Sequence, residues 1–148
     1  MDIRQISDLL SVSPQITEAD LSALRDAGFR SIICNRPDGE EADQPTFQKI
    51  ATAAKKLGIE ARHIPVAGGM VSDADAAAFR AALDEMPKPI LAYCRSGTRS
   101  ATLWALARAD ELPLAAILGA TQRAGYDMSC LVPRISDRLA SPEKISVK

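Results

Sequence analysis

The sequence of 148 residues predicts a single α/β domain that spans the whole chain and has a mostly parallel central sheet. Short apolar or β-branched segments alternate with segments that carry the capping and terminating residues of helices, which is the pattern of βαβ units. No internal repeat and no linker divides the chain, and its length suits one hydrophobic core.

The first elements are short. Residues 3–7 and 9–13 have the apolar character of two brief strands. Thr17 and Asp20 form a capping pattern, which predicts a helix over residues 17–28 that ends on a glycine.

The middle of the chain continues the alternation. The β-branched segment 29–34 predicts a buried strand, and the polar residues 35–45 predict a loop because they are rich in turn formers. A second helix is expected over residues 46–58, again ending on a glycine, and it is followed by a strand over residues 59–66. The segment 67–72 predicts a flexible loop.

A second capping pattern, Ser72 with Asp75, starts a helix that extends to about Met86. The remaining expected elements are a strand and two helices, over residues 87–93, 99–111 and 114–125. The tail after Pro133 is weakly patterned.

Composition and charge limit the classes of function. The formal net charge is −1, so the chain lacks the basic surface that a general nucleic-acid binder needs. No apolar segment is long enough to span a bilayer, and Met1 precedes a polar segment instead of a signal peptide. Cys34, Cys94 and Cys130 form neither a disulfide framework nor a metal-binding pair. We therefore expect a cytoplasmic protein that binds no nucleic acid, membrane, metal or cofactor.

The segment CRSGTRS, residues 94–100, follows an expected strand and leads directly into a helix. Ligands of open α/β sheets bind at the carboxyl ends of strands, and the amides at a helix start attract anions. Arg95 and Arg99 add two positive charges, and Gly97 permits a tight turn. Such surroundings favour the thiolate form of Cys94.

The loop therefore predicts an anion site in which Cys94 is the nucleophile and Arg99 is the second catalytic residue. The remaining loop residues are expected to bind the substrate anion: Arg95, Ser96, Gly97, Thr98 and Ser100. The alternative, a small buried hydrophobe, is the interpretation we adopt for Cys34 and Cys130. It is disfavoured for Cys94 because strand, glycine, arginines and helix start occur together.

Polar residues after the strand 29–34 are expected at the rim of the same pocket, namely Asn35, Arg36 and Asp38. A turn with an ion pair is the alternative for these residues, and the sequence leaves both open. His63 lies inside a strand pattern and is expected to be structural rather than a base.

C-R-S-G-T-R, residues 94–99, resembles the active loop of rhodanese-type sulfurtransferases, in which the cysteine carries a persulfide. GFRSIICNRPDGEE and HIPVAGG instead resemble the front half of dual-specificity cysteine phosphatases. Together these segments resemble the beta-lactamase hydrolase-like, phosphatase-like domain family, over a core of about residues 3–134. The resemblance implies a cysteine-phosphatase-like fold, with helices on both faces of the sheet and the anion loop after the last core strand.

Two departures from the phosphatase pattern favour sulfur transfer. Related phosphatases place five residues between cysteine and arginine, whereas four lie between Cys94 and Arg99, which predicts a smaller ring of amides. The loop in which those phosphatases carry an acid for the leaving group has the sequence AGGM here. Asp73 and Asp75 follow at a helix start, and Asp38 lies on another loop of the expected rim.

We therefore expect a sulfurtransferase in which Cys94 takes sulfur from thiosulfate or a low-molecular-weight persulfide and passes it to a thiol acceptor. One alternative is a phosphatase that acts through a phosphorylated Cys94, with Arg99 on the phosphoryl oxygens. The other is a non-catalytic anion-binding module. The resemblance also implies a place in sulfur metabolism, beside a persulfide-metabolising enzyme.

Overall fold

The computed structural model describes residues 1–68 and 71–140. Within these residues the strands form one sheet in the order β1-β2-β5-β3-β4. The strands are β1 Arg4–Gln5, β2 Leu10–Ser13, β3 Ser31–Cys34, β4 Glu60–His63 and β5 Ile90–Tyr93. β2, β5, β3 and β4 are parallel to one another, whereas β1 pairs antiparallel with β2. The prediction of one α/β domain with a mostly parallel sheet is confirmed.

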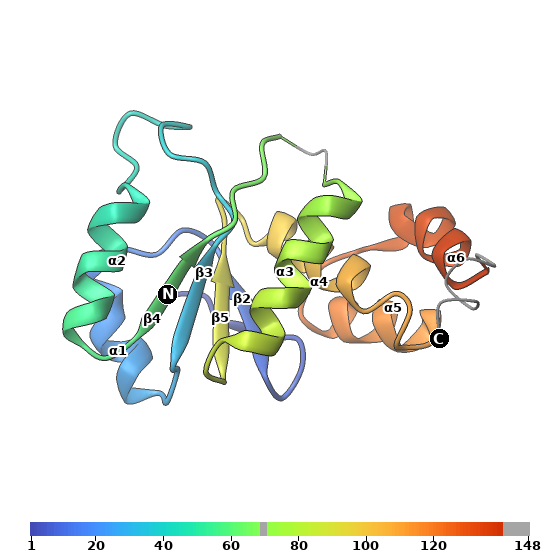
Figure 1. Ribbon diagram of the computed structural model, residues 1–148, viewed down its shortest axis with the longest axis horizontal. Coiled ribbons are helices and arrows are strands. Elements are labelled where there is room, and N and C mark those ends of the chain that lie inside the picture. Colours follow the sequence, from blue (N-terminus) through green and yellow to red (C-terminus); the bar gives the residue numbers. More distant parts are fainter. Residues whose placement is uncertain (69–70, 141–148) are drawn as a thin grey trace.

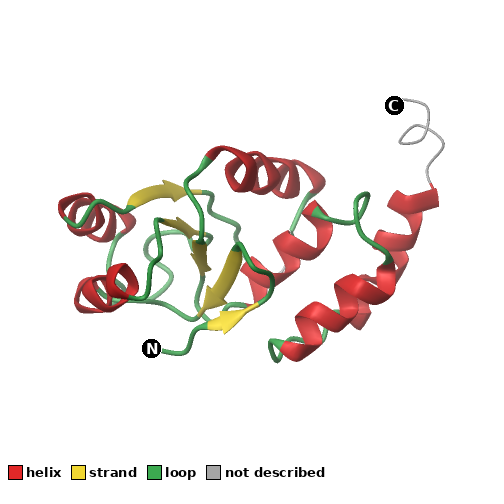
Figure 2. Cartoon of the chain, turned by 90° about the horizontal axis from the view of Figure 1, so that it is seen from below, coloured by secondary structure: helices red, strands yellow, loops and turns green. Residues whose placement is uncertain are grey.

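Helices cover both faces of this sheet (Figure 1). One face carries α1 Leu21–Asp26 and α2 Phe47–Lys56, and the other carries α3 Asp73–Glu85 and α4 Thr98–Ala107. Beyond α4, away from the sheet, lie α5 Leu114–Arg123 and α6 Val132–Ala140. Short 3-10 turns precede α1 and α6, namely η1 Glu18–Asp20 and η2 Ser129–Leu131. Figure 2 shows the same arrangement from below.

Local signals in the sequence set the helix starts. The Ser72 hydroxyl accepts a hydrogen bond from the Asp75 amide (3.0 Å), and the Asp75 carboxylate accepts one from the Ser72 amide (3.1 Å). This is the predicted capping box at the start of α3. Thr17 and Asp20 form a similar box, but the chain first makes a 3-10 turn there and becomes α-helical only at Leu21.

The C-terminal part departs from its prediction. The sequence predicted a weakly patterned tail after Pro133, but this segment forms most of α6, which continues to Ala140. Ile135 is buried in this helix, whereas Pro133 and Ser136 are exposed. Val132, Ile135 and Leu139 recur at helical spacing, so the sequence does carry a periodic signal for this short helix, and the prediction overlooked it. In the described part of the chain, no helix is long and apolar enough to cross a membrane.

The sheet separates two apolar cores because its central strands are buried on both faces. Ile33 and Ala92 pack with α3 and α4, whereas Ile32 and Leu91, each one position earlier, pack with α1 and α2. This alternation follows the two-residue period of a strand. Burial on both sides explains the continuous apolar character of β3 and β5.

The strands β3, β4 and β5 run in the same direction, so their carboxyl ends meet at one edge of the sheet (Figure 1). The loops that follow β3, β4 and β5 therefore converge at this edge. A backbone hydrogen bond joins two of these loops, because the Val66 amide donates to the Asn35 carbonyl oxygen at 3.1 Å. Open α/β sheets bind ligands at this edge, so the fold itself places the candidate site.

Candidate active site

Cys94 directly follows β5, and its side chain is fully buried at the carboxyl edge of the sheet. The Gly97 amide donates a hydrogen bond to the Cys94 Sγ atom at 3.0 Å. The Cys94 amide donates to the Ser13 carbonyl oxygen of β2 at 3.4 Å, which ties the start of the loop to the sheet. The short connection to α4 therefore curls around the sulfur atom and directs an N–H group at it.

Gly97 is required by the backbone of this loop. Its φ is +94°, in the left-handed region that other residues disfavour, and it immediately precedes α4. A Cβ atom at this position would also collide with the hydroxyl of Tyr126. The left-handed conformation lets the chain enter α4 at Thr98 while the Gly97 amide still faces the sulfur atom.

Arg99, in the first turn of α4, is held by three hydrogen bonds. Its Nη1 donates to Glu40 Oε2 (2.8 Å) and to the Val66 carbonyl oxygen (2.7 Å), and its Nη2 donates to Glu40 Oε1 (2.9 Å). The two bonds to Glu40 use the outer edge of the guanidinium. The described residues offer no oxygen acceptor to the Nε–H edge, so that edge remains for an anion. Hydrogen bonding to Glu40 raises the pKa of Arg99, and the nearby Cys94 acts in the same direction.

Glu40 connects Arg99 to a second, buried arginine. Arg36 is only 2% exposed, and its Nε donates to Glu40 Oε1 (2.9 Å) while its Nη2 donates to Glu41 Oε1 (2.6 Å). Its Nη1 donates to Gln15 Oε1 (3.1 Å). Hydrogen bonding to Arg99 lowers the pKa of Glu40 to about 2, and Arg36 acts in the same direction. Glu40 is therefore ionised at neutral pH and orients Arg99 instead of donating a proton.

The low pKa of Glu40 predicts a pH-dependent stability. Because this pKa is depressed in the folded protein, the pairing stabilises the fold fully above the unfolded value of about 4.3. The stabilisation is lost as the pH falls toward 2. We expect Glu40→Gln to lower the Tm by about 3 °C at pH 7, and by clearly less near pH 2.

Thermal unfolding of the wild-type protein, of Glu40→Gln and of a control variant at the two pH values checks this result. The control is Asp26→Asn, which removes a highly exposed ion pair with Arg25 and should match the wild-type Tm throughout. An effect of Glu40→Gln that is equally large at both pH values would contradict the pairing.

Ser100 and Asn35 lie deeper than the anion-binding and rim positions predicted for them. The buried Ser100 hydroxyl donates to Asn35 Oδ1 at 2.8 Å, and Asn35 Nδ2 donates to the Ile64 carbonyl oxygen at 2.9 Å. These bonds join the segments that follow β3, β4 and β5. Within the described structure neither side chain is bonded to Cys94, so their position indicates support of the loop.

The remaining loop side chains lie at the exposed mouth. Ser96 Oγ donates to Thr98 Oγ1 at 3.0 Å, and both residues are exposed. The Arg95 side chain is 68% exposed, with its Nε 3.4 Å from a carboxylate oxygen of Glu41. The Arg99 side chain is 13% exposed. Arg99 is therefore the fixed cation of the loop, and Arg95 is the one that solvent screens.

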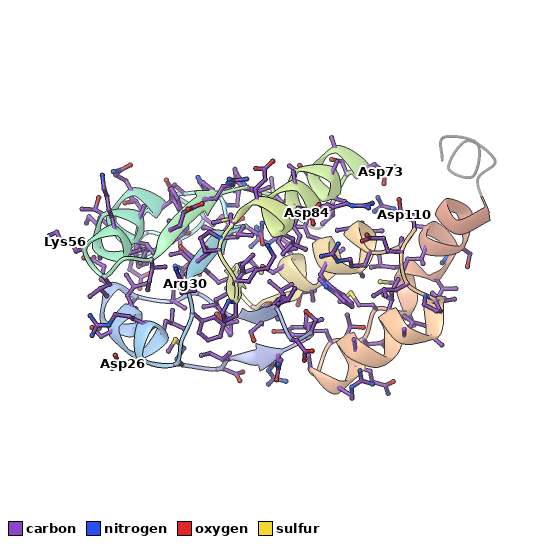
Figure 3. The ribbon with its side chains drawn as sticks, turned by 60° about the horizontal axis from the view of Figure 1, so that its bottom comes forward. Asp26, Arg30, Lys56, Asp73, Asp84 and Asp110 are labelled. Atoms are coloured by element: carbon purple, nitrogen blue, oxygen red, sulfur yellow. The ribbon has the colours of Figure 1, made fainter. Side chains whose placement is uncertain are left out.

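The acids considered as proton donors are all engaged elsewhere. Asp38 accepts a hydrogen bond at 2.8 Å from a backbone amide in the first turn of α2. Asp75 caps α3, and Asp73 pairs with Arg134 at 3.0 Å. Figure 3 shows Asp73 at the end of α3 that lies nearest the C-terminal helix. The end of the AGGM segment lies outside the described residues.

The other two cysteines differ from each other. Cys34 is buried at the end of β3, donates to the Arg36 carbonyl oxygen (3.3 Å), and has a thiol pKa raised by burial, as suits a structural residue. Cys130 was predicted to be buried as well, but it is exposed on η2.

The only histidine of the sequence has a structural environment. His63 Nε2 lies 2.9 Å from the Arg36 carbonyl oxygen, and the His63 ring stacks on Phe47 with centroids 4.6 Å apart. These contacts give His63 the structural role expected from the sequence.

The sequence analysis did not identify three residues that contribute to the site. Glu40 carried a usable signal, because it stands four positions after Arg36 in a loop at the same sheet edge as Arg99. Val66 contributes through its backbone, which no side-chain pattern reveals. Tyr126 donates to a loop carbonyl oxygen from far along the chain and has no local signal.

The mostly parallel sheet, the buried cysteine after its central strand and the arginine at the start of the next helix define a cysteine-phosphatase-like α/β domain. The chain belongs to the family described as beta-lactamase hydrolase-like protein, phosphatase-like domain, whose model matches residues 2–111. The family and the fold predicted from the sequence are thereby confirmed. The segment from α5 onward lies beyond the matched residues.

Curated relatives carry the same family name. The beta-lactamase hydrolase-like protein of Agrobacterium fabrum is 39% identical over 105 residues, which are 71% of this chain and 24% of that protein. The protein of the same name from Xylella fastidiosa is 37% identical over 106 residues, which are 72% of this chain and 25% of that protein. The chain therefore spans about a quarter of the length of these relatives.

Solved structures share the fold. The crystal structure of a candidate phosphatase from Neisseria meningitidis is similar to this chain, with 35% sequence identity and a TM-score of 0.83. The match covers 93% of this chain and 98% of that chain. Tk-PTP in the active form is 20% identical with a TM-score of 0.69, over 93% and 95% of the two chains. The catalytic domain of the PP-IP phosphatase SIW14 from S. cerevisiae is 14% identical, with a TM-score of 0.67, over 99% and 90%. The last two show the fold alone.

The phosphatase descriptions of the family and of the Neisseria structure contradict the sulfurtransferase prediction, which is wrong. That prediction took the number of residues between Cys94 and Arg99 as a measure of pocket width. The structure shows that Glu40 and Val66, from other loops, hold the arginine in place. The second departure was the lack of an acid that protonates the leaving group. Such an acid determines which leaving groups depart readily, but phosphoryl transfer to the cysteine does not require it. The sulfur donor, thiol acceptor and persulfide-metabolising partner follow only from the rejected chemistry.

Proposed function

We propose that this chain is a cysteine-dependent hydrolase of phosphate monoesters that acts through a phosphorylated Cys94. The observation that supports this most is the cradle around the sulfur atom. It combines the Gly97 amide, 3.0 Å from Sγ, with the Nε–H edge of Arg99, to which the described residues offer no oxygen acceptor. These N–H groups suit the oxygens of a phosphoryl group bound to sulfur. Membership of a phosphatase-like family supports the same chemistry.

In the first step the Cys94 thiolate attacks the phosphorus atom in line with the leaving oxygen. A sulfur–phosphorus bond forms, the ester oxygen–phosphorus bond breaks, and the electron pair of that bond stays on the leaving oxygen. Arg99 and the Gly97 amide balance the charge on the other phosphoryl oxygens. Glu40 holds Arg99 in place, so little reorganisation is needed during the step.

In the second step water attacks the phosphorus atom, the sulfur–phosphorus bond breaks, and Cys94 is released as a thiolate. The net reaction converts the ester and water into an alcohol and inorganic phosphate. Asp38, Asp73 and Asp75 are engaged in other contacts, and Glu40 is ionised, so in this scheme the leaving oxygen takes its proton from water. Esters of acidic alcohols such as phenols are therefore the favoured substrates.

This preference is the test of the proposed function. We expect kcat/KM for p-nitrophenyl phosphate to exceed that for an alkyl phosphate at least about a hundredfold, because an acid is commonly worth about 10²–10⁴ in rate. Release of inorganic phosphate measures both reactions. Asp38→Asn should leave the ratio unchanged, since that carboxylate serves the start of α2. Failure to hydrolyse either ester, with intact fold, would refute the proposal.

A further inference from the structure

We propose that Tyr126, in the segment after α5, is a positioning residue for the Cys94 loop, a role that rests on the proposed phosphoryl transfer. The Tyr126 hydroxyl donates a hydrogen bond to the Ser96 carbonyl oxygen at 3.2 Å, across 30 positions of sequence. The residue lies beyond residues 2–111, which the family model matches. The C-terminal helical part of the chain thus reaches into the anion loop.

A single peptide group connects Tyr126 to the sulfur atom. The Ser96 carbonyl and the Gly97 N–H belong to the same planar trans peptide, so they point in opposite directions. The carbonyl accepts from Tyr126 on one side, and the N–H donates to Cys94 Sγ on the other. Rotation of this peptide would turn a carbonyl oxygen toward the anion. The hydroxyl therefore fixes the orientation that stabilises a thiolate and a bound phosphoryl group.

Tyr126 is itself held in place. Its side chain is buried, and its hydroxyl lies so close to Gly97 that a Cβ atom there would collide with it. The Arg4 guanidinium lies 5.9 Å from the ring centroid and donates to the Ala124 carbonyl oxygen at 3.0 Å. A side chain at Gly125 would collide with Arg4, so glycine permits this contact. Burial raises the pKa of the Tyr126 phenol, which therefore remains a donor at neutral pH.

Tyr126→Phe tests this role because it keeps the ring and removes only the hydroxyl. We expect alkylation of Cys94 by iodoacetamide at pH 6 to slow about tenfold. The kcat for p-nitrophenyl phosphate should fall by a similar factor with little change in KM. A Cys130→Ser background removes the exposed thiol from the measurement.

Thr121→Val is the matched control. It deletes a hydroxyl of the same C-terminal segment that, among the described residues, bonds only to carbonyl oxygens within α5, so alkylation and kcat should stay at wild-type values. A Tyr126→Phe protein that is alkylated at the wild-type rate would overturn the proposal even if its Tm is lower. A purely structural residue changes stability without changing the reactivity of the thiol.

Arg4→Leu gives a second test that leaves the hydroxyl in the chain. Loss of the guanidinium loosens the hold on Tyr126 and should slow alkylation at pH 6 about threefold. Unchanged alkylation in both variants would refute the role of Tyr126. Alkylation needs no turnover, so failure of the wild-type protein to hydrolyse phosphate esters would refute the proposed function and still leave Tyr126 tested.

Discussion

Replacement of Cys94 by serine is expected to reduce hydrolysis of p-nitrophenyl phosphate at least about a thousandfold, or about 4 kcal/mol in the activation barrier. A serine hydroxyl does not ionise near neutral pH, and it needs a neighbouring base to attack phosphorus. The only histidine of the chain, His63, is bonded to the Arg36 carbonyl oxygen and stacked on Phe47. The loop itself is unchanged in the variant, which should therefore still bind inorganic phosphate.

Cys130→Ser is the control for this experiment. It exchanges the same atoms at an exposed position outside the anion loop and should leave kcat/KM at the wild-type value. More than about a tenth of the wild-type rate in Cys94→Ser would mean that another group attacks the substrate.

The second large effect is expected for Arg99→Lys, with a loss of at least about a hundredfold in kcat/KM. A lysine keeps the charge but cannot bond Glu40 through one edge and a phosphoryl group through another. Arg95→Lys, at a side chain that is 68% exposed, should change kcat/KM by less than about threefold.

Thermal unfolding is measured alongside, because Arg99→Lys also weakens the pairing with Glu40. Activities are then compared well below the Tm of each variant. Equal losses for the two arginine variants would show that the loop attracts its anion by total charge, and that Arg99 holds no phosphoryl oxygen.

Features that depend on neighbouring residues were predictable. The Ser72–Asp75 capping box and the β-branched run that ends at Cys34 gave the start of α3 and the position of β3. The order of the sheet was not predictable, because β2 pairs with β5 and not with β3, the next strand in the sequence. The apolar patterns of the strands are too similar to specify their neighbours.

The same distinction applies to the site. The Cys94 loop could be recognised because its strand end, glycine, arginines and helix start are contiguous. The partner of Arg99 could not be chosen, because Glu40 lies 59 positions away, and Tyr126 reaches the loop only through tertiary packing. Loop length therefore predicted the wrong chemistry. The width of an anion site depends on where the arginine is held. The number of residues between the cysteine and the arginine does not determine that position.

The most direct test of a phosphorylated Cys94 is mass spectrometry of protein that is rapidly denatured during turnover of p-nitrophenyl phosphate. We predict a gain of one phosphoryl group that maps to Cys94, is present in Cys130→Ser and is absent from Cys94→Ser. A phosphoryl group on another residue, or turnover without any phosphorylated Cys94, would contradict the proposed mechanism.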